Sequence, residues 1–493
     1  MKIFLSVMIS AALVFPAHSA TDPVKGALAL YKKNHYEDAA GMLLPHVSKS
    51  KPAESGAANL TLGMIFLNNA RLHDKLYQLS LTLHNDYLER LSKRSGKDKS
   101  RFIRLYLGEA FLEAGRSKKA AAYLGKFIGY KKTPKKYRDI ARAKLGLAYF
   151  MQGKKKKAKA VWSRLPGSDP ELLSELAHIY VKAGISKPEP VSLCKKALQL
   201  LKKRQGRPSA RMVKNIIGVY ADKGLVDEGL ALLALSDLKG YSYEERAAKN
   251  KVIRYYDIDL LKNLSLFYGA AAIHYLDKAS TDAKVKGPSA YYLGEAYSAF
   301  GSLDRSIVVT DSFLSSAGMP GPFKVKARSR QAYNSYRKGN KKALTSFWNN
   351  LSPKEKANAD LLAEVLFACN RLKIDFPQVF SKALAVAAQK KGKKHYALNF
   401  AIGSHYLGKK DYKNAVIYME SVRDKGNKNR IEFNAPLLLV SLSEAYYKTK
   451  QFSEALEIYF EMSKQFSALR QIQVVMQGIY SLEQKSAGDV KIF

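Results

Sequence analysis

The chain is poor in cysteine. Among its 493 residues only Cys194 and Cys369 carry a thiol, and they lie 175 residues apart (369 − 194) within apolar stretches. A disulfide needs Cα atoms within about 7 Å of each other. We therefore expect two buried free thiols, although an oxidising compartment would also permit a pair. The sequence contains no Cys-x-x-Cys-His attachment site, which excludes covalent haem.

Long apolar runs are confined to the N-terminus. Residues 3–15 form an apolar segment that follows Lys2, ends at Pro16 and precedes the small residues Ser19 and Ala20. This order is typical of a secretory signal peptide, and the segment is short for a membrane span of about 20 residues. We therefore expect export, cleavage near Ser19 or Ala20, and a periplasmic mature chain that does not span a membrane. An uncleaved N-terminal anchor is the alternative.

Recognisable enzyme signatures are also missing. The sequence has no Gly-rich phosphate loop, no His-Glu-x-x-His and no Gly-x-Ser-x-Gly, the motifs that hold phosphates, zinc or a nucleophilic serine. His395 and His405 have no acidic residue between them, so we interpret them as packing or surface residues. We expect a protein that is not an enzyme, with no catalytic residues, no metal site and no cofactor.

The clearest feature that is present is a repeated spacing. Gly146, Tyr149, Gly153, Ala158 and Trp162 set out small, aromatic, glycine, alanine and bulky side chains in a fixed order. The small residue permits close approach of two helices, the aromatic fills the space between them, and the glycine allows the positive φ that ends the first helix. The alanine seats the second helix, and the bulky side chain reaches the next hairpin. The spacing predicts a helix–turn–helix unit that cannot bury its apolar face alone.

The same spacing recurs along most of the chain. Further copies comprise Ala27, Leu30, Asn34, Ala39 and Leu43; Gly108, Phe111, Gly115, Ala120 and Leu124; Gly294, Tyr297, Gly301, Ser306 and Thr310; Gly403, Tyr406, Lys410, Ala415 and Met419; and Ser443, Tyr446, Lys450, Ala455 and Tyr459. In the last two copies Lys410 and Lys450 replace the turn glycine. The pattern resembles the tetratricopeptide repeat family, at roughly its period in the mid-thirties. The resemblance, to an exported bacterial type, implies an all-α fold: a right-handed α-solenoid of stacked helix–turn–helix repeats. Strand-forming alternation is scarce, which agrees with this fold.

The copies also predict how the chain is divided. We expect a signal peptide at 1–20, an N-terminal array at 21–240, a degenerate helical connector at 241–287, a C-terminal array at 288–485 and a frayed tail at 486–493. Within the connector we expect a helix at 270–279, with a partner helix within 250–266 that contains a hinge or kink.

The resemblance further implies that the first helix of each hairpin lines a concave groove. Carried over to this sequence, the groove residues are Leu147, Phe150, Met151, Leu407, Glu444 and Tyr447. Such a surface, apolar to mildly acidic, suits an extended peptide or a partner helix. The alternative is that these side chains pack against neighbouring helices.

The charge balance is the second clue. Lys and Arg number 83 against 42 Asp and Glu, a formal net charge of +41. Part of this charge falls in the turns of the predicted hairpins, which stacking would align along one edge as a basic ridge. The predicted basic ridge comprises Arg116, Lys118, Lys119, Lys154, Lys155, Lys156, Lys157, Lys341, Lys342, Lys409 and Lys410. A field of like charges attracts polyanions, here anionic polysaccharide, lipopolysaccharide or an acidic membrane surface. Plain solvation of the lysines is the alternative, and no nucleic-acid motif accompanies them.

Two functions follow from these features. The first is a non-enzymatic periplasmic scaffold that mediates protein–protein contacts in a cell-envelope machine for secretion, pilus assembly, motility or polysaccharide export. The second is a polyanion-binding module that uses the basic ridge. Envelope proteins are the partners expected for the first, and an anionic polysaccharide or lipid surface for the second; we expect no nucleic acid.

Overall fold

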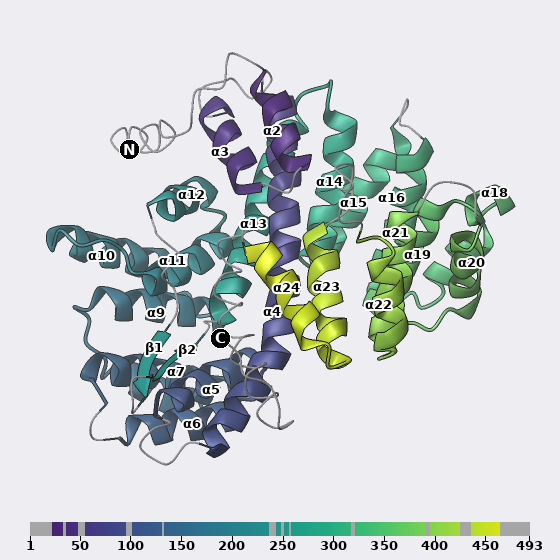
Figure 1. Cartoon of the computed structure of the whole chain (residues 1–493). Coiled ribbons are helices and arrows are strands. Elements are labelled where there is room, and N and C mark those ends of the chain that lie inside the picture. Colours follow the sequence, from purple (N-terminus) through teal and green to yellow (C-terminus); the bar gives the residue numbers. More distant parts are fainter. Residues whose placement is uncertain are drawn as a thin grey trace. The chain divides into compact units, whose positions relative to one another are not determined.

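The computed structural model of the chain describes residues 22–32, 36–47, 55–94, 101–130, 133–235, 243–247, 251–255, 258–316, 321–389, 395–423 and 435–463 (Figure 1). The predicted signal peptide at 1–20 and the tail at 486–493 lie outside these residues. Among the described residues no helix is both long enough and apolar enough to cross a membrane.

The fold is all-α and divides into two compact units. Unit 1 comprises Met1–Leu72 and Ala271–Gln465, and unit 2 comprises His73–Ala270 and Phe466–Phe493. The division differs from the predicted one, because residues near the N-terminus group with the C-terminal hairpins. Two long helices, α4 (Gly56–Arg94) and α13 (Ile258–Ala279), each contribute residues to both units.

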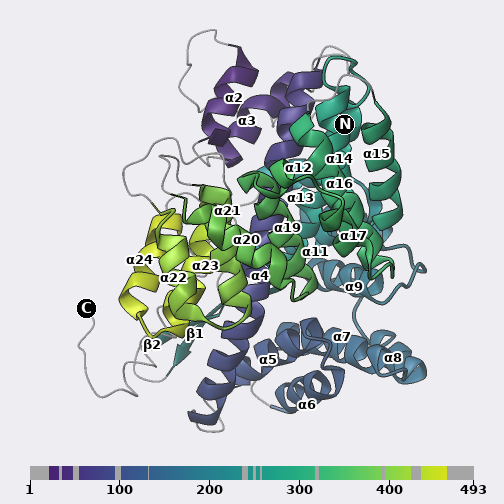
Figure 2. The same ribbon diagram turned by 90° about the vertical axis from the view of Figure 1, so that its right-hand side faces the viewer.

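Unit 2 is a run of hairpins in which each helix packs against its neighbours. The helices are α5 (Arg101–Glu113), α6 (Ser117–Ile128), α7 (Lys135–Met151), α8 (Lys155–Trp162), α9 (Pro170–Lys182), α10 (Pro190–Lys203), α11 (Ala210–Lys223) and α12 (Val226–Ala234). Figures 1 and 2 both show α5, α6 and α7 side by side. The first helices α7, α9 and α11 also pack against one another, so they form a common face.

Glycines in the first helices allow this close packing. A Cβ atom on Gly146 would overlap the ring of Trp162, and one on Gly108 would overlap Leu124. In both hairpins the overlapping side chain lies sixteen residues further on (162 − 146 and 124 − 108). The pairing of small and bulky residues on which the repeat spacing rests is therefore present in the structure.

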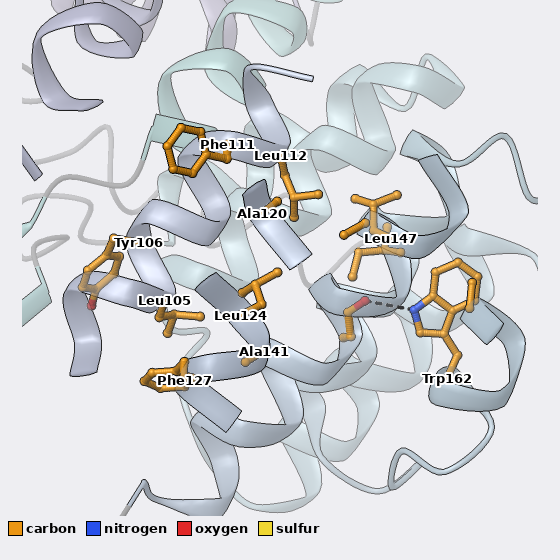
Figure 3. Packing of buried hydrophobic residues seen from close by; sticks show 14 of the residues in the cluster. Leu105, Tyr106, Phe111, Leu112, Ala120, Leu124, Phe127, Ala141, Leu147 and Trp162 are labelled. Carbon is orange, nitrogen blue, oxygen red and sulfur yellow. Dashed lines mark hydrogen bonds between the residues drawn. The ribbon is translucent and has the colours of Figure 1, made fainter. Parts of the chain in front are cut away.

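The core of unit 2 is made by these facing side chains (Figure 3). Leu124, Phe127 and Leu147 are buried, as is Trp162, whose indole Nε1 donates a hydrogen bond to the carbonyl oxygen of Ala143 at 2.9 Å. Trp162 also meets Tyr180 of the next hairpin edge to face, with ring centroids 5.4 Å apart. One side chain therefore joins the two helices of its own hairpin and the following hairpin.

Unit 1 has the same construction. Its helices are α2 (Pro23–Lys32), α3 (Tyr36–Val47), α14 (Lys286–Ala299), α15 (Leu303–Ser315), α16 (Gly321–Arg337), α17 (Ala343–Asn349), α18 (Pro353–Lys356), α19 (Ala359–Leu372), α20 (Pro377–Ala387), α21 (Tyr396–Gly408), α22 (Tyr412–Glu420), α23 (Ala435–Lys448) and α24 (Phe452–Ser463). A Cβ on Gly403 would overlap Met419, again sixteen residues on (419 − 403).

At each hairpin turn that the structure describes, the turn position has a left-handed backbone. In unit 2 it is occupied by Gly115, Gly153, Gly184 and Gly224, and in unit 1 by Gly301, Gly339, Lys373, Lys410 and Lys450, all with positive φ. The predicted placement of Lys410 and Lys450 at this position is confirmed, with φ values of 64° and 65°.

The connector is the main departure from the predicted secondary structure. A partner helix was expected within 250–266, but β1 (Tyr243–Ala247) and β2 (Lys251–Tyr255) form an antiparallel hairpin there, with Tyr243 opposite Tyr255. The second strand contains Val252, Ile253 and Tyr255, and β-branched and aromatic residues favour this conformation. Continuous α13 then replaces both the end of that partner and the separate helix expected at 270–279.

The two cysteines lie in different units. Cys194 on α10 and Cys369 on α19 are both buried and free, as predicted. Burial raises the pKa of each thiol to about 12, so both are neutral near pH 7.

Candidate functional site

The first helices of unit 2 present a face that is rich in buried charge. We call these side chains, together with those of α13 that meet them, the ion network. Its members are Glu109 and Glu113 on α5, Lys144 on α7, Glu175 and Lys182 on α9, Arg211 and Lys214 on α11, and Asp259 and Lys262 on α13. The network therefore joins the common face of the hairpins to one additional helix.

Asp259 is the point at which three lysines converge. Its carboxylate lies 3.5 Å from the Nζ of Lys144, 3.4 Å from that of Lys182 and 3.5 Å from that of Lys214. The aspartate occupies the first turn of α13, where the helix dipole also favours a negative charge. Burial alone would raise the pKa of Asp259, but the three lysines outweigh burial and hold it well below its usual range.

Two glutamates on the hairpins bind Lys144 and a second cation, Arg211. Glu175 lies 2.8 Å from Lys144 and 3.6 Å from Arg211, and Glu109 lies 3.5 Å and 3.4 Å from those cations. Burial opposes ionisation of Glu175, but Lys144, Lys214 and Arg211 together lower its pKa below the ordinary range. Glu175 is therefore ionised, and the two glutamates hold Lys144 and Arg211 in place.

Glu113 is the exception among the acids. It pairs with Lys182, lies 3.3 Å from the Nζ of Lys262 and hydrogen-bonds to the side chain of Asp259. Burial and the neighbouring Asp259 raise the pKa of Glu113. The two carboxyl groups thus share one proton more readily than two separate carboxylates would.

Neutral polar groups complete the contact between α13 and the face. The Asn263 amide Nδ2 donates to the backbone carbonyl oxygen of Lys214 at 3.0 Å and lies 3.4 Å from the Nε2 of His178. Gly218 makes room for both side chains, because a Cβ there would lie within 3 Å of each. Burial, followed by the charge of Lys182, lowers the pKa of His178 well below its usual value, so the imidazole is neutral.

The same part of α13 also buries apolar side chains. Leu260, Leu261, Leu264 and Phe267 are fully buried, and Phe267 rests against Gly229 of α12. Each such side chain contributes roughly 1.5–3 kcal/mol on burial. Each buried ion, however, loses hydration worth several kcal/mol, which its partners only partly restore. The docking of α13 is therefore a balance between apolar gain and charge desolvation.

Little space remains inside the ion network. The residual cavity has about 10 Å³, which is room for one water. Its lining includes Glu109, Glu113, Lys144, His178 and Asp259. Small-molecule sites usually offer about 300–1,000 Å³, so this cavity is not one. Among the described residues no group of three or more His, Cys, Asp and Glu is arranged to hold a metal ion.

Unit 1 contains a simpler version of the same arrangement. Glu295 on α14 pairs with Arg330 on α16 and lies 3.3 Å from Arg71 on α4. Arg330 also donates to the carbonyl oxygen of Tyr291 at 3.0 Å. Burial opposes ionisation of Glu295, but the two arginines outweigh it and lower its pKa to about 2.

The predicted groove residues fall in both units. Leu147 is buried in the core of unit 2, Phe150 beside it is half-buried, and the Met151 side chain is 45% exposed. Leu407, on α21, and both Glu444 and Tyr447, on α23, are half-buried in unit 1. The most accessible of these positions is therefore Met151, at the end of its helix.

All residues of the predicted basic ridge are exposed. Arg116, Lys118, Lys119 and Lys154 to Lys157 belong to unit 2, and Lys341, Lys342, Lys409 and Lys410 belong to unit 1. Several cover aromatic rings: the Nζ of Lys157 lies 4.3 Å from the ring centroid of Tyr149, and that of Lys341 lies 4.4 Å from that of Tyr336. These lysines thus shield apolar surface as well as carrying charge.

Sequence reasoning did not find the ion network. It assigned no role to Asp259, Lys144 or Lys214. A signal was nonetheless available, because Glu109 and Lys144 are 35 residues apart, as are Glu295 and Arg330 (144 − 109 and 330 − 295). A glutamate followed one repeat later by a cation indicates an ion pair between successive first helices.

Comparison with known proteins supports the repeat interpretation over one segment. Residues 142–171 match the model of the tetratricopeptide repeat family. The matched segment includes the end of α7, all of α8 and the start of α9. No curated protein sequence matches the chain.

Three solved structures show low similarity to this chain. The crystal structure of yeast Tom70 is 12% identical with a TM-score of 0.33, covering 95% of this chain and 98% of that one. The Cut9–Hcn1 hetero-tetramer of the APC/C is 12% identical with a TM-score of 0.28, covering 93% and 89%. The P58(IPK) TPR domain is 15% identical with a TM-score of 0.21, covering 78% and 99%. These similarities are too low for any property of those proteins to be assigned to this chain.

Proposed function

We propose that this protein is a non-enzymatic scaffold of the cell envelope, which holds partner proteins against the first-helix faces of its hairpins. The observation that carries the proposal is the ion network: the first-helix face of unit 2 holds the first turns of a helix, α13, through ion pairs and amide hydrogen bonds. A surface that recognises one helix in this way is suited to protein–protein contact.

The location is the finer part of the proposal. The N-terminal segment at 1–20 has the order of a signal peptide, and this supports a periplasmic mature chain. A repeat scaffold in that compartment would assemble a secretion, pilus, motility or polysaccharide-export machine. The proposed contact residues are the accessible groove positions Phe150, Met151, Leu407, Glu444 and Tyr447.

Site-specific photo-crosslinking in living cells tests this proposal. A photoreactive amino acid replaces Met151 or Tyr447, and matched controls carry it at Val308 on α15 or Ile417 on α22, whose side chains are 67% and 62% exposed. We expect adducts with an envelope protein from the groove positions but not from the control positions. The mass of the mature chain in the periplasmic fraction shows whether cleavage occurs near Ser19 or Ala20.

Two results would count against the scaffold in the envelope. Equal adducts from all four positions would show that the groove is not selective. A full-length chain in the cytoplasm would remove the envelope from the proposal.

A polyanion-binding module is the second candidate, and the placement of the lysines favours it. Helices α6 and α8 begin with cations and have no acidic residue in their first turn. The helix dipole makes the N-terminus positive, so cations there cost roughly 0.3–1 kcal/mol. A binding role for anions would explain why the chain tolerates that cost.

Salt dependence separates the two candidates. In one variant Lys154, Lys155, Lys156 and Lys157 become Gln; the control converts Lys195, Lys196, Lys202 and Lys203 on α10, which are also exposed. If the ridge binds polyanions, only the first variant elutes earlier from an anionic polysaccharide column at about 0.15 M salt. An equal loss of retention in both variants would show that net charge alone causes the binding.

A further inference from the structure

The first-helix face of unit 2 contains buried charges that a permanently closed interior does not need. Nine ionisable side chains of the ion network lie where α13 meets the hairpins. Glu175 and Lys214 are completely inaccessible there. Ionised groups lose hydration when they are buried, and apolar side chains of similar size would stabilise a permanent core at least as well. The charges suit a face that is hydrated in one state and covered by a helix in another.

Helix α13, which covers this face, contacts it through residues at defined spacings. Asp259 meets three lysines, Lys262 meets Glu113 three residues later, and Asn263 meets Lys214 and His178 four residues later. Residues three and four apart lie on the same side of a helix. Phe267, eight residues after Asp259, occupies the space left by Gly229.

We propose that residues 258–270 of α13 are an internal ligand of this face, which a partner helix with aspartate in its first turn, lysine three, asparagine four and a large aromatic eight residues later displaces. The proposal rests on the scaffold function above and deepens it, because it names the chemistry of one partner and the way in which the site is kept closed. A partner binds only those molecules in which α13 has left the face. Its apparent affinity is therefore its intrinsic affinity multiplied by the fraction of open molecules.

Hydrogen exchange on the intact full-length protein is the first test. We expect amides in 258–270 to exchange through an opening that leaves α9 and α11 protected. The measurement follows exchange by mass spectrometry at several denaturant concentrations. If 258–270 exchanges only together with α9 and α11, the segment is a permanent core element and the proposal is overturned.

Peptide competition is the second test. The probe is a fluorescent synthetic peptide of residues 256–272, added to the full-length chain. We expect it to bind the Asp259→Asn chain about tenfold tighter than the wild type, because the internal ligand is weakened and the open fraction rises. The same peptide with Asn in place of Asp259 should lose this binding, since it cannot pair with the three lysines.

Matched variants keep the test decisive. Asp277→Asn alters an exposed aspartate on the same helix and should leave peptide binding as in the wild type. If Asp259→Asn does not fold, Lys262→Gln serves instead, because that side chain is 38% exposed and loses only its contact with Glu113 and its position over the Tyr77 ring. The proposal is overturned if both peptides bind equally, or if neither the Asp259→Asn nor the Lys262→Gln chain binds the peptide. Crosslinking at Met151 and Tyr447 would still test the scaffold function.

Discussion

The two units place the same tetrapeptide in the same structural role and surround it differently. Leu-Gly-Glu-Ala occurs at 107–110 in unit 2 and at 293–296 in unit 1. In each unit the glycine faces the second helix of its hairpin, and the glutamate pairs with a cation 35 residues later on the next first helix. Glu109 shares its cations with other carboxylates of the ion network. Among the described residues, Glu295 is the only carboxylate within ion-pair distance of Arg71 and Arg330.

This difference indicates that the same residue at the same position of the repeat contributes differently to the stability of the two units. A buried ion pair is worth little against an apolar replacement, but removal of one partner leaves the other charge buried and uncompensated. In unit 2 the remaining carboxylates still neutralise the lysines and arginine. In unit 1 two arginines depend on one glutamate, so we expect the same substitution to have different effects in the two units.

The largest expected effect is that of Glu295→Gln on unit 1. The change leaves Arg71 and Arg330 without their carboxylate, and we expect a loss of about 3–5 kcal/mol in the free energy of unfolding of that unit. The matched change Glu109→Gln should cost unit 2 about 1–3 kcal/mol, the range for a lost buried hydrogen bond. Urea denaturation of each variant measures both values.

Each unit contains its own reporter for this measurement. The chain has two tryptophans, Trp162 in unit 2 and Trp348 in unit 1, and both are buried. A Trp162→Phe background reports unfolding of unit 1, and Trp348→Phe reports that of unit 2. Equal losses from the two glutamine substitutions would contradict the difference drawn between the units.

Acid should destabilise unit 1 through the same glutamate. The pKa of Glu295 is about 2 in the folded chain and about 4.3 in an unfolded one. Its contribution is complete above the unfolded value and is lost as the pH falls through the folded value. We therefore expect the free energy of unfolding of unit 1 to fall by about 3 kcal/mol between roughly pH 4.5 and pH 2. Trp348 fluorescence measures this loss. An identical pH dependence in the Glu295→Gln chain would show that other groups cause the loss.

The fold could be predicted from the sequence because the repeat spacing is a local steric requirement. The glycine that faces a bulky side chain sixteen residues later leaves a direct trace, as Gly146 and Trp162 show. Even Lys410 and Lys450 could be aligned at the turn, because the flanking residues fixed the register. The strand at 251–255 was missed because the expectation of continuous helical hairpins outweighed a short segment with two β-branched residues and a tyrosine.

The ion network could not be predicted in the same way, because its members come from five helices of unit 2. Asp259 and Lys144 are 115 residues apart in the chain, and no periodicity brings an aspartate of the connector to a lysine of a regular repeat. The 35-residue interval from Glu109 to Lys144 was visible, but the sequence alone does not show which charged residues are buried.

A smaller effect is expected at the turn position, where the two units differ in residue type. Unit 2 has glycine at all four such turns, whereas the last three of unit 1 have lysine. A left-handed backbone costs a non-glycine residue roughly 1–2 kcal/mol, while glycine costs about 0.5–1 kcal/mol in unfolded-state entropy. We expect Lys410→Gly to stabilise unit 1 by about 0.5–1 kcal/mol and Gly153→Lys to destabilise unit 2 by a similar amount, both by urea denaturation. Two shifts of the same sign would show that the backbone conformation is not the cause.

The smallest expected effect concerns the lysines at helix ends. Lys156 lies in the first turn of α8, and Lys202 lies in the last turn of α10, so the two cations lie at opposite ends of the helix dipole. We expect Lys156→Glu to stabilise unit 2 by roughly 0.3–1 kcal/mol and Lys202→Glu to destabilise it by a comparable amount at low salt. Both side chains are exposed and both substitutions change the net charge equally; a shift common to the two therefore reports net charge, and the difference between them reports the dipole. If Lys156→Glu also weakens retention on an anionic polysaccharide while it stabilises the fold, the chain keeps this lysine at a cost in stability, and the ridge then has a role beyond solvation.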